Sequence, residues 1–254
     1  MNRVARTTDT TASPTACALS MTAVWSGYGG TTVLRDVDLD VPAGAVVALL
    51  GANGAGKTTL LRTANGLVRP RAGRIQIGGT DHTRNAPHRR ARAGLCLIPE
   101  GRGIFRSLTV RENLRLQVPP WLRSENCVEK ATAAFPALGP KLNQLAGTLS
   151  GGQQQMLALT RAYLSEASLV LLDEVSMGLA PRVVDEIFES LARLKEDGIA
   201  LLLVEQYVER ALELADAVVL LRRGEVIFRG LPTDLDQAAL VDSYLGRGES
   251  VLTT

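Results

Sequence analysis

The chain has 254 residues, of which 46% are hydrophobic and 21% charged, and its 28 basic and 26 acidic side chains leave a formal net charge of +2. These values describe one globular unit with a large core, and the balanced charge argues against a strongly basic nucleic-acid-binding protein. The longest apolar runs, such as 199–204 and 217–221, fall far short of the roughly 18 to 20 residues that a membrane-spanning helix needs.

The chain begins with a segment, 1–18, that is rich in Thr, Ser and Ala and lacks the apolar stretch of a secretory signal. We expect a disordered tail here. The three cysteines are odd in number and scattered, which fits neither a disulfide framework nor a zinc site. Their pattern favours a reducing, cytoplasmic compartment.

Residues 19–254 are predicted to form a single domain in which short strands alternate with helices. We expect strands at 21–25, 46–50, 95–98, 169–173, 200–204, 217–221 and 225–229. Several are apolar at every position, as strands of a parallel sheet covered on both faces must be. We expect helices at 57–66, 151–166, 181–195 and 205–214. The alternation predicts an α/β fold with a mostly parallel, buried sheet.

The strand pattern stops between 101 and 149, where helix formers are interrupted by Pro119, Pro120, Pro136 and Pro140. We expect an inserted helical subdomain in this segment. The core would then be built from the segments on either side of it, 19–100 and 150–254.

A glycine-rich loop lies between the predicted strand 46–50 and the helix that follows it. It matches G-x-x-x-x-G-K-[ST], and its residues are Gly51, Ala52, Asn53, Gly54, Ala55, Gly56, Lys57, Thr58 and Thr59. Such a loop turns successive backbone N–H groups toward phosphate oxygens, and the helix N-terminus adds partial positive charge. We expect Lys57 to reach the β- and γ-phosphates and Thr58 to ligate Mg²⁺.

An acidic pair ends the predicted strand 169–173. A phosphate-binding loop of this kind needs a carboxylate on the metal side, and Asp173 is predicted to serve there. Glu174 is one residue farther and points elsewhere, so we expect it to be the general base for an attacking water.

The pentapeptide 149–153 reads Leu-Ser-Gly-Gly-Gln and immediately precedes a predicted helix. A serine and two glycines at a helix N-terminus form a second anion-binding surface. In this context the chain resembles the nucleotide-binding subunits of ATP-binding cassette (ABC) proteins, whose signature is this pentapeptide. The resemblance implies a head-to-tail dimer in which Ser150, Gly151, Gly152 and Gln153 of one subunit cover the γ-phosphate of ATP held by the other. It also implies the ABC ATPase fold, with a P-loop core, an antiparallel β subdomain and a helical subdomain.

Further site positions are implied by this resemblance. Tyr28 falls where the family places an aromatic ring on adenine, and the loop 176–181 resembles the one that communicates across the dimer. Glu100 stands where most members have a glutamine, and a carboxylate can still ligate Mg²⁺. Gln206 stands where most have a histidine that contacts the γ-phosphate; its amide donates a hydrogen bond but cannot titrate near pH 7.

The segments Pro-Glu-Gly-Arg at 99–102, Val-Glu-Gln at 204–206 and the final Tyr-Leu-Gly at 244–246 resemble one branch of the family, the ATPase subunits of branched-chain amino acid importers and the related urea and amide importers. This resemblance implies an ATP-hydrolysing, energy-coupling subunit that pairs with an identical or a different ATPase chain. It implies two integral membrane permease subunits as partners, an extracytoplasmic solute-binding protein as an indirect partner, and a peripheral position on the cytoplasmic face of the membrane. The segment 103–108, with Phe105 and Leu108, is the candidate docking surface, unless these side chains pack into their own lobe.

A soluble ABC ATPase that acts on nucleic acid or ribosomes is the alternative. The basic run Arg84, His88, Arg89, Arg90 and Arg92 could contact phosphates. However, 254 residues do not accommodate the paired cassettes or long coiled coils of such proteins, so we interpret this run as a solvated loop and helix face and expect no nucleic-acid partner. The two histidines, His82 and His88, match no motif and are also expected in solvated loops.

Overall fold

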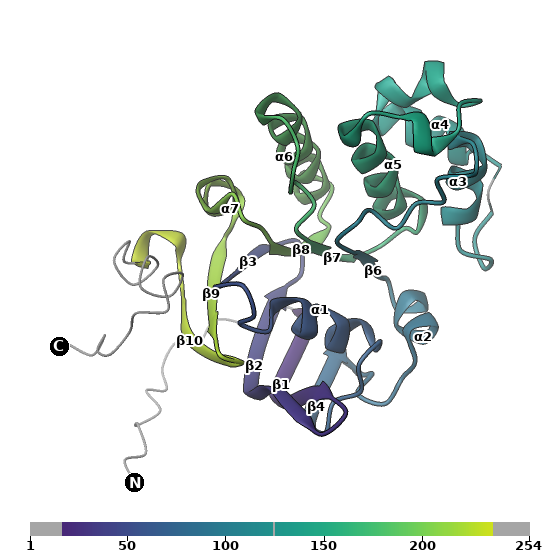
Figure 1. Ribbon diagram of the computed structural model, residues 1–254. Helices are drawn as coiled ribbons and strands as arrows, with labels where there is room; N and C mark the ends of the chain where they lie inside the picture. Colours follow the sequence, from purple (N-terminus) through teal and green to yellow (C-terminus); the bar gives the residue numbers. More distant parts are fainter. Residues whose placement is uncertain (1–16, 124, 236–254) are drawn as a thin grey trace, which may run out of the picture.

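The computed structural model describes residues 17–123 and 125–235 (Figure 1). Most of the predicted N-terminal tail and the Tyr-Leu-Gly at 244–246 lie outside these residues. Within the described ranges, no helix is both long enough and apolar enough to cross a membrane.

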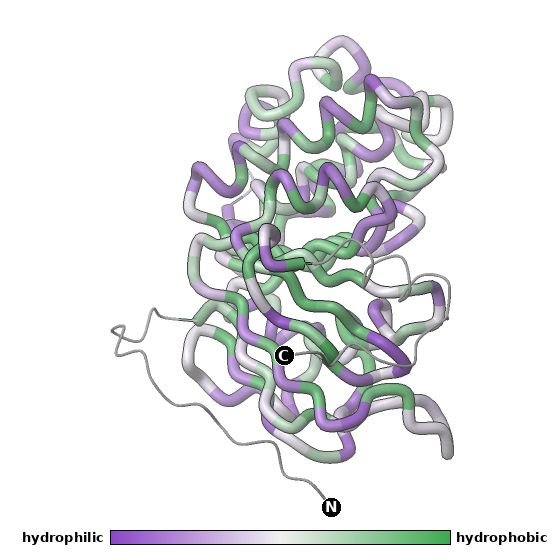
Figure 2. The backbone as a smooth tube through the Cα atoms, turned by 90° about the vertical axis from the view of Figure 1, so that its left-hand side faces the viewer, coloured by the Kyte–Doolittle hydropathy of each residue, from purple (hydrophilic) through white to green (hydrophobic). Residues whose placement is uncertain are grey.

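A six-stranded sheet forms the centre of the molecule, in the order β10-β9-β3-β8-β7-β6. Its strands are β3 (Val46–Leu50), β6 (Leu95–Ile98), β7 (Leu169–Asp173), β8 (Ala200–Val204), β9 (Ala217–Arg222) and β10 (Glu225–Gly230). All neighbours pair in parallel except β9 and β10. Every residue of β3, β7 and β8 is buried, which is why these strands are apolar throughout. In Figure 2, hydrophobic segments run through the middle of the molecule. The predicted parallel core is confirmed.

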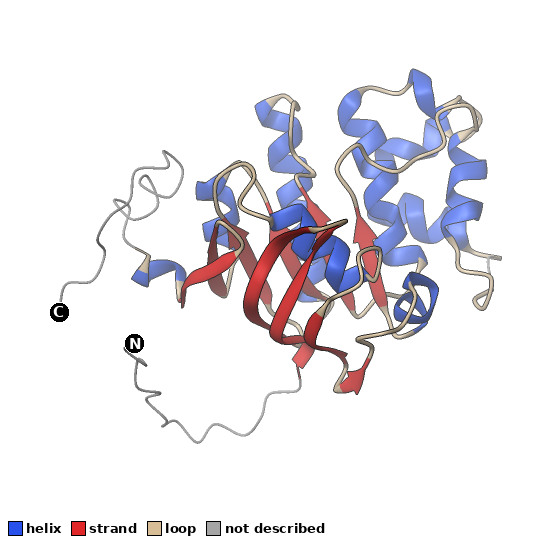
Figure 3. Cartoon of the chain, turned by 60° about the horizontal axis from the view of Figure 1, so that its bottom comes forward, coloured by secondary structure: helices blue, strands red, loops and turns tan. Residues whose placement is uncertain are grey.

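A second, antiparallel sheet has the order β2-β1-β4-β5 (Figure 3). Its strands are β1 (Cys17–Tyr28), β2 (Thr31–Pro42), β4 (Ala72–Ile77) and β5 (Thr80–Asp81). The strand pattern had located only 21–25 within this sheet. The register of β1 against β2 shifts several times, so apolar and polar positions in β1 do not alternate strictly. In β2, buried Val37, Leu39 and Val41 alternate with exposed aspartates, a strand signal that the prediction missed.

The helices of the described residues are α1 (Lys57–Asn65), α2 (Pro87–Arg92), α3 (Val110–Gln117), α4 (Cys127–Ala134), α5 (Gly151–Leu164), α6 (Pro181–Glu196) and α7 (Val208–Leu214). Helix α1 packs on one face of the central sheet, and α5, α6 and α7 contribute to the core on the other. Alternate residues of β3 point to different clusters: Val46, Ala48 and Leu50 pack with α5 and α6, whereas Val47 and Leu49 pack with α1 and the antiparallel sheet. Two cores therefore share one sheet. The helices α3, α4 and α5 pack against one another to one side of it (Figure 1).

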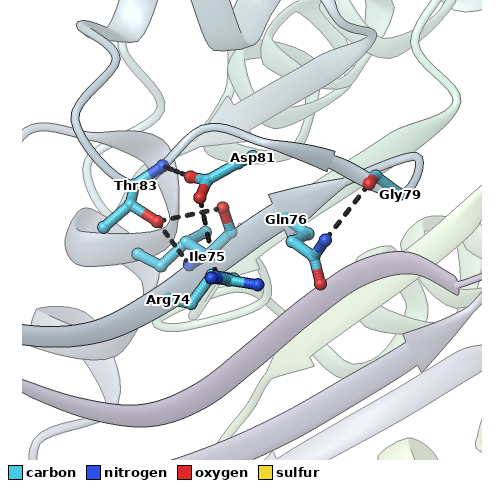
Figure 4. Close-up of polar contacts among 6 residues, drawn as sticks. All are labelled: Arg74, Ile75, Gln76, Gly79, Asp81 and Thr83. Atoms are coloured by element: carbon cyan, nitrogen blue, oxygen red, sulfur yellow. Dashed lines mark hydrogen bonds and ion pairs between the residues drawn. The ribbon is translucent and has the colours of Figure 1, made fainter.

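The connection from β4 to α2 is ordered by local hydrogen bonds (Figure 4). The Thr83 hydroxyl accepts a bond from the Ile75 N–H at 2.9 Å, and Asp81 Oδ1 accepts one from the Thr83 N–H at 2.8 Å. These bonds turn the chain back over β4. His82 is consequently buried, and the expectation that it is a solvated loop residue is wrong. Burial, with the nearby charge of Arg90, lowers the pKa of His82.

Arg90 is the second exception to the predicted solvated face. Arg84, His88, Arg89 and Arg92 are exposed, but Arg90 is 1% exposed. Its guanidinium donates to Thr63 O and Ala64 O at 2.8 and 2.6 Å, and to the carbonyls of Asn85 and Thr83. Burial lowers the pKa of Arg90 to about 10. Arg90 therefore caps the carbonyl end of α1, which otherwise ends at Gly66 in the left-handed conformation.

We expect Arg90→Met to lower the free energy of unfolding by about 2 to 4 kcal/mol, because it fills a similar volume but leaves several buried carbonyls without a donor. Urea unfolding monitored by circular dichroism measures the change. Arg89→Met, on the exposed face of the same helix, is the matched control and should change stability by less than about 0.5 kcal/mol. Equal stability of the two variants would contradict the capping role.

Candidate functional site

The glycine-rich loop connects the buried strand β3 to α1. Gly51 has φ +148°, and a Cβ there would lie 2.2 Å from the carbonyl oxygen of Leu221. Gly56 has φ +110° and packs against Val33 and Leu34 of β2. The loop is therefore wedged between β9 and the antiparallel sheet, and only glycine fits at position 51. Asn53 and Gly54 are exposed at its tip, whereas Ala55 and Thr59 are buried.

The ammonium group of Lys57 lies inside this loop. It donates to Gly51 O at 2.8 Å and to Ala52 O at 3.1 Å, and the residue is 7% exposed. Burial lowers the pKa of Lys57, whereas the negative charges of Glu174 and Asp173 raise it. The structure thus brings this lysine together with the acidic pair at the end of β7.

Oxygen atoms gather next to Lys57. The Thr58 hydroxyl donates to Asp173 Oδ1 at 3.2 Å. Burial raises the pKa of Asp173, the bond from Thr58 lowers it, and the charges of Glu174 and Glu100 raise it. Asp173 is 4% exposed, and Glu100 faces it from an exposed position after β6. One hydroxyl and two carboxylates are hard oxygen donors of the kind that Mg²⁺ prefers.

Glu174 is held in an uncommon backbone conformation, with φ +50°. Its N–H donates to Val204 O at 2.9 Å. Gln206 Nε2 donates to Glu174 Oε2 at 2.9 Å, and also lies 3.4 Å from the sulfur of Met177. The structure therefore joins the predicted base directly to the residue in the usual histidine position. The predicted helix at 205–214 begins only at Val208, so that 205–207 form a loop at this site.

Ser150 caps the N-terminus of α5. Its hydroxyl accepts from the Gln153 N–H at 3.3 Å, and Gln153 Oε1 accepts from the Ser150 N–H at 3.2 Å. A Cβ on Gly152 would lie 2.3 Å from Val183 Cγ1, and one on Gly151 would lie 3.2 Å from Arg102 Nη2. The two glycines thus allow α6 and Arg102 to approach the first turn of α5. Within the described residues, no hydrogen bond or ion pair joins this turn to Lys57 or Thr58.

Tyr28 lies at the end of β1, where it pairs with Thr31 across the turn of the hairpin. The residue is 45% exposed, so its ring presents a face to solvent. Val33 and Leu34, which continue the same hairpin, contact Gly56 of the glycine-rich loop. The hairpin that carries Tyr28 therefore flanks this loop.

Two residues near the site were not predicted. Arg102 lies against the first turn of α5 and donates to Gln154 Oε1. Glu205 is 1% exposed and bonds to Ser176. Each belongs to a segment that the sequence analysis had singled out, but the residue types indicate neither the contact of Arg102 with α5 nor the burial of Glu205. A charged residue directly after the apolar strand β8 was the one available signal for Glu205.

The sequence profile of the ABC transporter family matches residues 34–177, which is more than half of the chain. The high-affinity branched-chain amino acid transport ATP-binding protein BraG of Pseudomonas aeruginosa is 39% identical over 231 residues, which are 90% of this chain and 99% of BraG. The probable branched-chain amino acid transport ATP-binding protein LivF of Archaeoglobus fulgidus is 37% identical and covers 83% of this chain and 90% of its own length.

A solved ATP-binding subunit of an ABC transporter superposes with a TM-score of 0.76 at 29% identity, and the match covers 85% of this chain and 91% of that one. The profile match, the relatives and the shared fold agree with the arrangement of the glycine-rich loop, the acidic strand end and the Ser-Gly-Gly turn. The chain belongs to the ABC transporter family, as one of its ATP-binding domains.

Proposed function

We propose that this protein is the ATP-hydrolysing, energy-coupling subunit of an importer for branched-chain amino acids. The observation that supports the proposal is the cluster of Lys57, Thr58, Asp173, Glu174 and Gln206, in which an ammonium group, oxygen atoms and an amide lie close together. The substrate class rests on the likeness to BraG and LivF, which share most of their length with this chain.

Each residue of the site has a separate role in the proposed hydrolysis of ATP. The loop amides and Lys57 bind the phosphates of ATP, and Tyr28 stacks on adenine. Thr58, Asp173 and Glu100 would hold Mg²⁺, which when bound neutralises charge on the β- and γ-phosphates. Water attacks the γ-phosphorus while the bond to the β-phosphate oxygen breaks, and the Glu174 carboxylate takes a proton from that water. Gln206 donates to the Glu174 carboxylate, and its amide would contact the γ-phosphate by giving up its contact with the Met177 sulfur.

The first turn of α5 completes the site of a second ATPase subunit, which is an identical or a different chain. The capping box occupies the N–H groups of Ser150 and Gln153. Among the described contacts, the Gly151 and Gly152 N–H groups donate no hydrogen bond, so both can point to an anion at the helix N-terminus. This arrangement supports two ATP molecules bound between two subunits.

The segment 103–108 is the proposed docking surface for the membrane permease subunits. Phe105 is 57% exposed. The buried side chain of Asn113 accepts from the Phe105 N–H at 2.8 Å and donates to Phe105 O at 2.9 Å, so the backbone that presents this ring is fixed. An exposed aromatic ring on an anchored loop suits a groove in a partner protein. This surface, together with the likeness to transport ATP-binding proteins, supports a peripheral position at the cytoplasmic face of the membrane.

Phe105→Asp should abolish association with membranes that contain the permeases while soluble ATP hydrolysis stays within about twofold of the parental rate. The reason is that a charge replaces the apolar contact, whereas the ATP site is untouched. Leu231→Asp is the matched control, because Leu231 is 56% exposed and follows β10 at the opposite edge of the core sheet. Co-sedimentation with native membranes measures the effect. Unchanged sedimentation of Phe105→Asp would remove this segment from the interface.

The proposed function is tested by isolating the tagged protein from its native membranes in mild detergent and identifying its partners by mass spectrometry. Two multi-spanning permeases, a second ATPase chain and a solute-binding protein would support an importer. The binding protein can then be titrated with leucine, isoleucine, valine, urea and amides. The ligand that it binds distinguishes a branched-chain amino acid importer from a urea or amide importer. Recovery of ribosomal proteins or nucleic acid without a permease would contradict the proposal.

A further inference from the structure

Two loops run side by side at the edge of the sheet where β7 and β8 end. Glu174 N–H donates to Val204 O at 2.9 Å, and Gln206 Nε2 returns to Glu174 Oε2 at 2.9 Å. Between these two contacts lies Glu205, whose side chain points into the other loop rather than to solvent. The segments 174–177 and 204–206 are thus joined at three successive positions.

Glu205 is the central contact. Its Oε1 accepts from the Ser176 N–H at 3.1 Å, and its Oε2 accepts from the Ser176 hydroxyl and from the Gln206 N–H at 3.3 Å. Ser176 is fully buried and Glu205 is 1% exposed. Among the described residues, Glu205 forms no salt bridge.

A carboxylate in such a place is costly, because burial disfavours its charge. The same burial raises the pKa of Glu205, and the hydrogen bonds from Ser176 and Gln206 partly offset this effect. The repulsive charge of Glu174 also raises the pKa. An apolar side chain would fill this space without these costs, but it could not accept hydrogen bonds from both loops. The arrangement therefore favours connection of the loops over stability.

We propose that Glu205 is a positioning residue of the ATPase reaction, which ties Ser176 to the backbone of Gln206 and so keeps the Gln206 amide on the Glu174 carboxylate. The proposal rests on the roles of Glu174 and Gln206 given above. Without the tie, the loop that follows Glu174 and the loop that carries Gln206 can move apart, and a displacement of about 1 Å at a reacting group can cost about 100-fold in rate.

The test compares Glu205→Gln with the parental protein. The isosteric amide keeps one acceptor oxygen but turns an NH₂ group toward an N–H donor on one of the two loops. We expect kcat for ATP to fall at least about tenfold with KM within about twofold, because ATP is bound elsewhere. In Ser176→Ala, which removes only the hydroxyl donor, kcat should fall less than in Glu205→Gln. Glu209→Gln makes the same chemical change at an exposed position on α7 and should match the parental kcat.

Two further readouts separate positioning from a general loss of structure. If Glu205 acts through Gln206, then Glu205→Gln combined with Gln206→Ala should have the kcat of Gln206→Ala alone, whereas multiplying effects would overturn the proposal. Hydrogen exchange followed by mass spectrometry should be faster over 174–177 and 204–206 in Glu205→Gln, with no matching increase over β3 and β9, and unchanged exchange over the two loops would overturn the proposal.

The exchange readout also separates this proposal from the proposed function, because it needs no turnover. Parental kcat in Gln206→Ala would contradict the proposed role of Gln206, and exchange would then still decide whether Glu205 joins the loops. Parental kcat in Glu205→Gln, with full activity loss in Glu174→Gln, would overturn the positioning role and leave the proposed function intact.

Discussion

Glu174→Gln should bind ATP as the parental protein does but hydrolyse it about 10²- to 10⁴-fold more slowly, which is the range that a general base contributes. The amide fills the same space and can still accept the hydrogen bond from Gln206 Nε2, so the loop geometry is kept. It cannot take a proton from water. Because ATP stays intact, the nucleotide-bound dimer should accumulate. Single-turnover hydrolysis and size-exclusion chromatography with ATP measure the two effects.

The control for this substitution is Glu225→Gln, at the exposed start of β10, which should hydrolyse ATP at the parental rate. A parental rate in Glu174→Gln itself would show that another group accepts the proton. Asp173 would be the first alternative to examine, since it shares the cluster. Its bond from Thr58 makes it a poorer candidate, because this bond holds its carboxylate on the proposed metal side.

The backbone at Glu174 explains why this residue can be both fixed and reactive. A φ of +50° is uncommon for a residue with a side chain and costs on the order of 1 to 3 kcal/mol. Such strain persists only where neighbouring contacts impose it, and here the Val204 carbonyl holds the Glu174 N–H. The turn directs the chain away from β7 directly after Asp173. Adjacent carboxylates can therefore face different partners, Thr58 and Gln206 respectively.

The core strands could be predicted from the sequence because burial on both faces leaves a continuous apolar signal, as in β3, β7 and β8. The antiparallel sheet was predicted only at 21–25. The register shifts of β1 and the exposed first half of β4 weaken its pattern, whereas the alternation of buried and exposed residues at 37–41 of β2 was overlooked. The glycine-rich loop could be predicted from the sequence because positive φ angles and close backbone approach require its glycines. Helix α7 was predicted three residues too early, because 205–207 are helix-compatible in sequence but are held by bonds to the loop after Glu174.

The residues that sequence reasoning placed wrongly or missed are charged side chains with internal partners. Arg90 and His82 looked like solvated residues because charge and polarity usually indicate solvent, and Glu205 carried no motif. Their partners are backbone groups and a serine hydroxyl from segments distant in sequence, such as Thr63 O for Arg90 and Ser176 for Glu205. Such partners are defined only once the chain has folded.

Lys57→Ala should weaken ATP binding by about 10- to 100-fold, since a hydrogen bond from a charged donor contributes about 1.5 to 3 kcal/mol and each 1.4 kcal/mol is about tenfold in affinity. The electrostatic reason is specific to this site. Burial lowers the pKa of Lys57, and the nearby charges of Glu174 and Asp173 only partly offset this effect. Without the lysine, the phosphates would meet these two carboxylates with no compensating charge. Isothermal titration with Mg²⁺ and ATP measures the affinity.

Lys57→Arg separates charge from shape. It keeps the positive charge, but Lys57 is 7% exposed and its ammonium is enclosed by the Gly51 and Ala52 carbonyls, so a planar guanidinium cannot take the same position. We expect Lys57→Arg to bind ATP more weakly than the parental protein and more tightly than Lys57→Ala, and Lys130→Ala, at an exposed site on α4, to bind as the parental protein does. Parental affinity in Lys57→Ala would mean that the loop amides alone hold the phosphates, and the lysine would then have to act after binding, on charge that develops during hydrolysis.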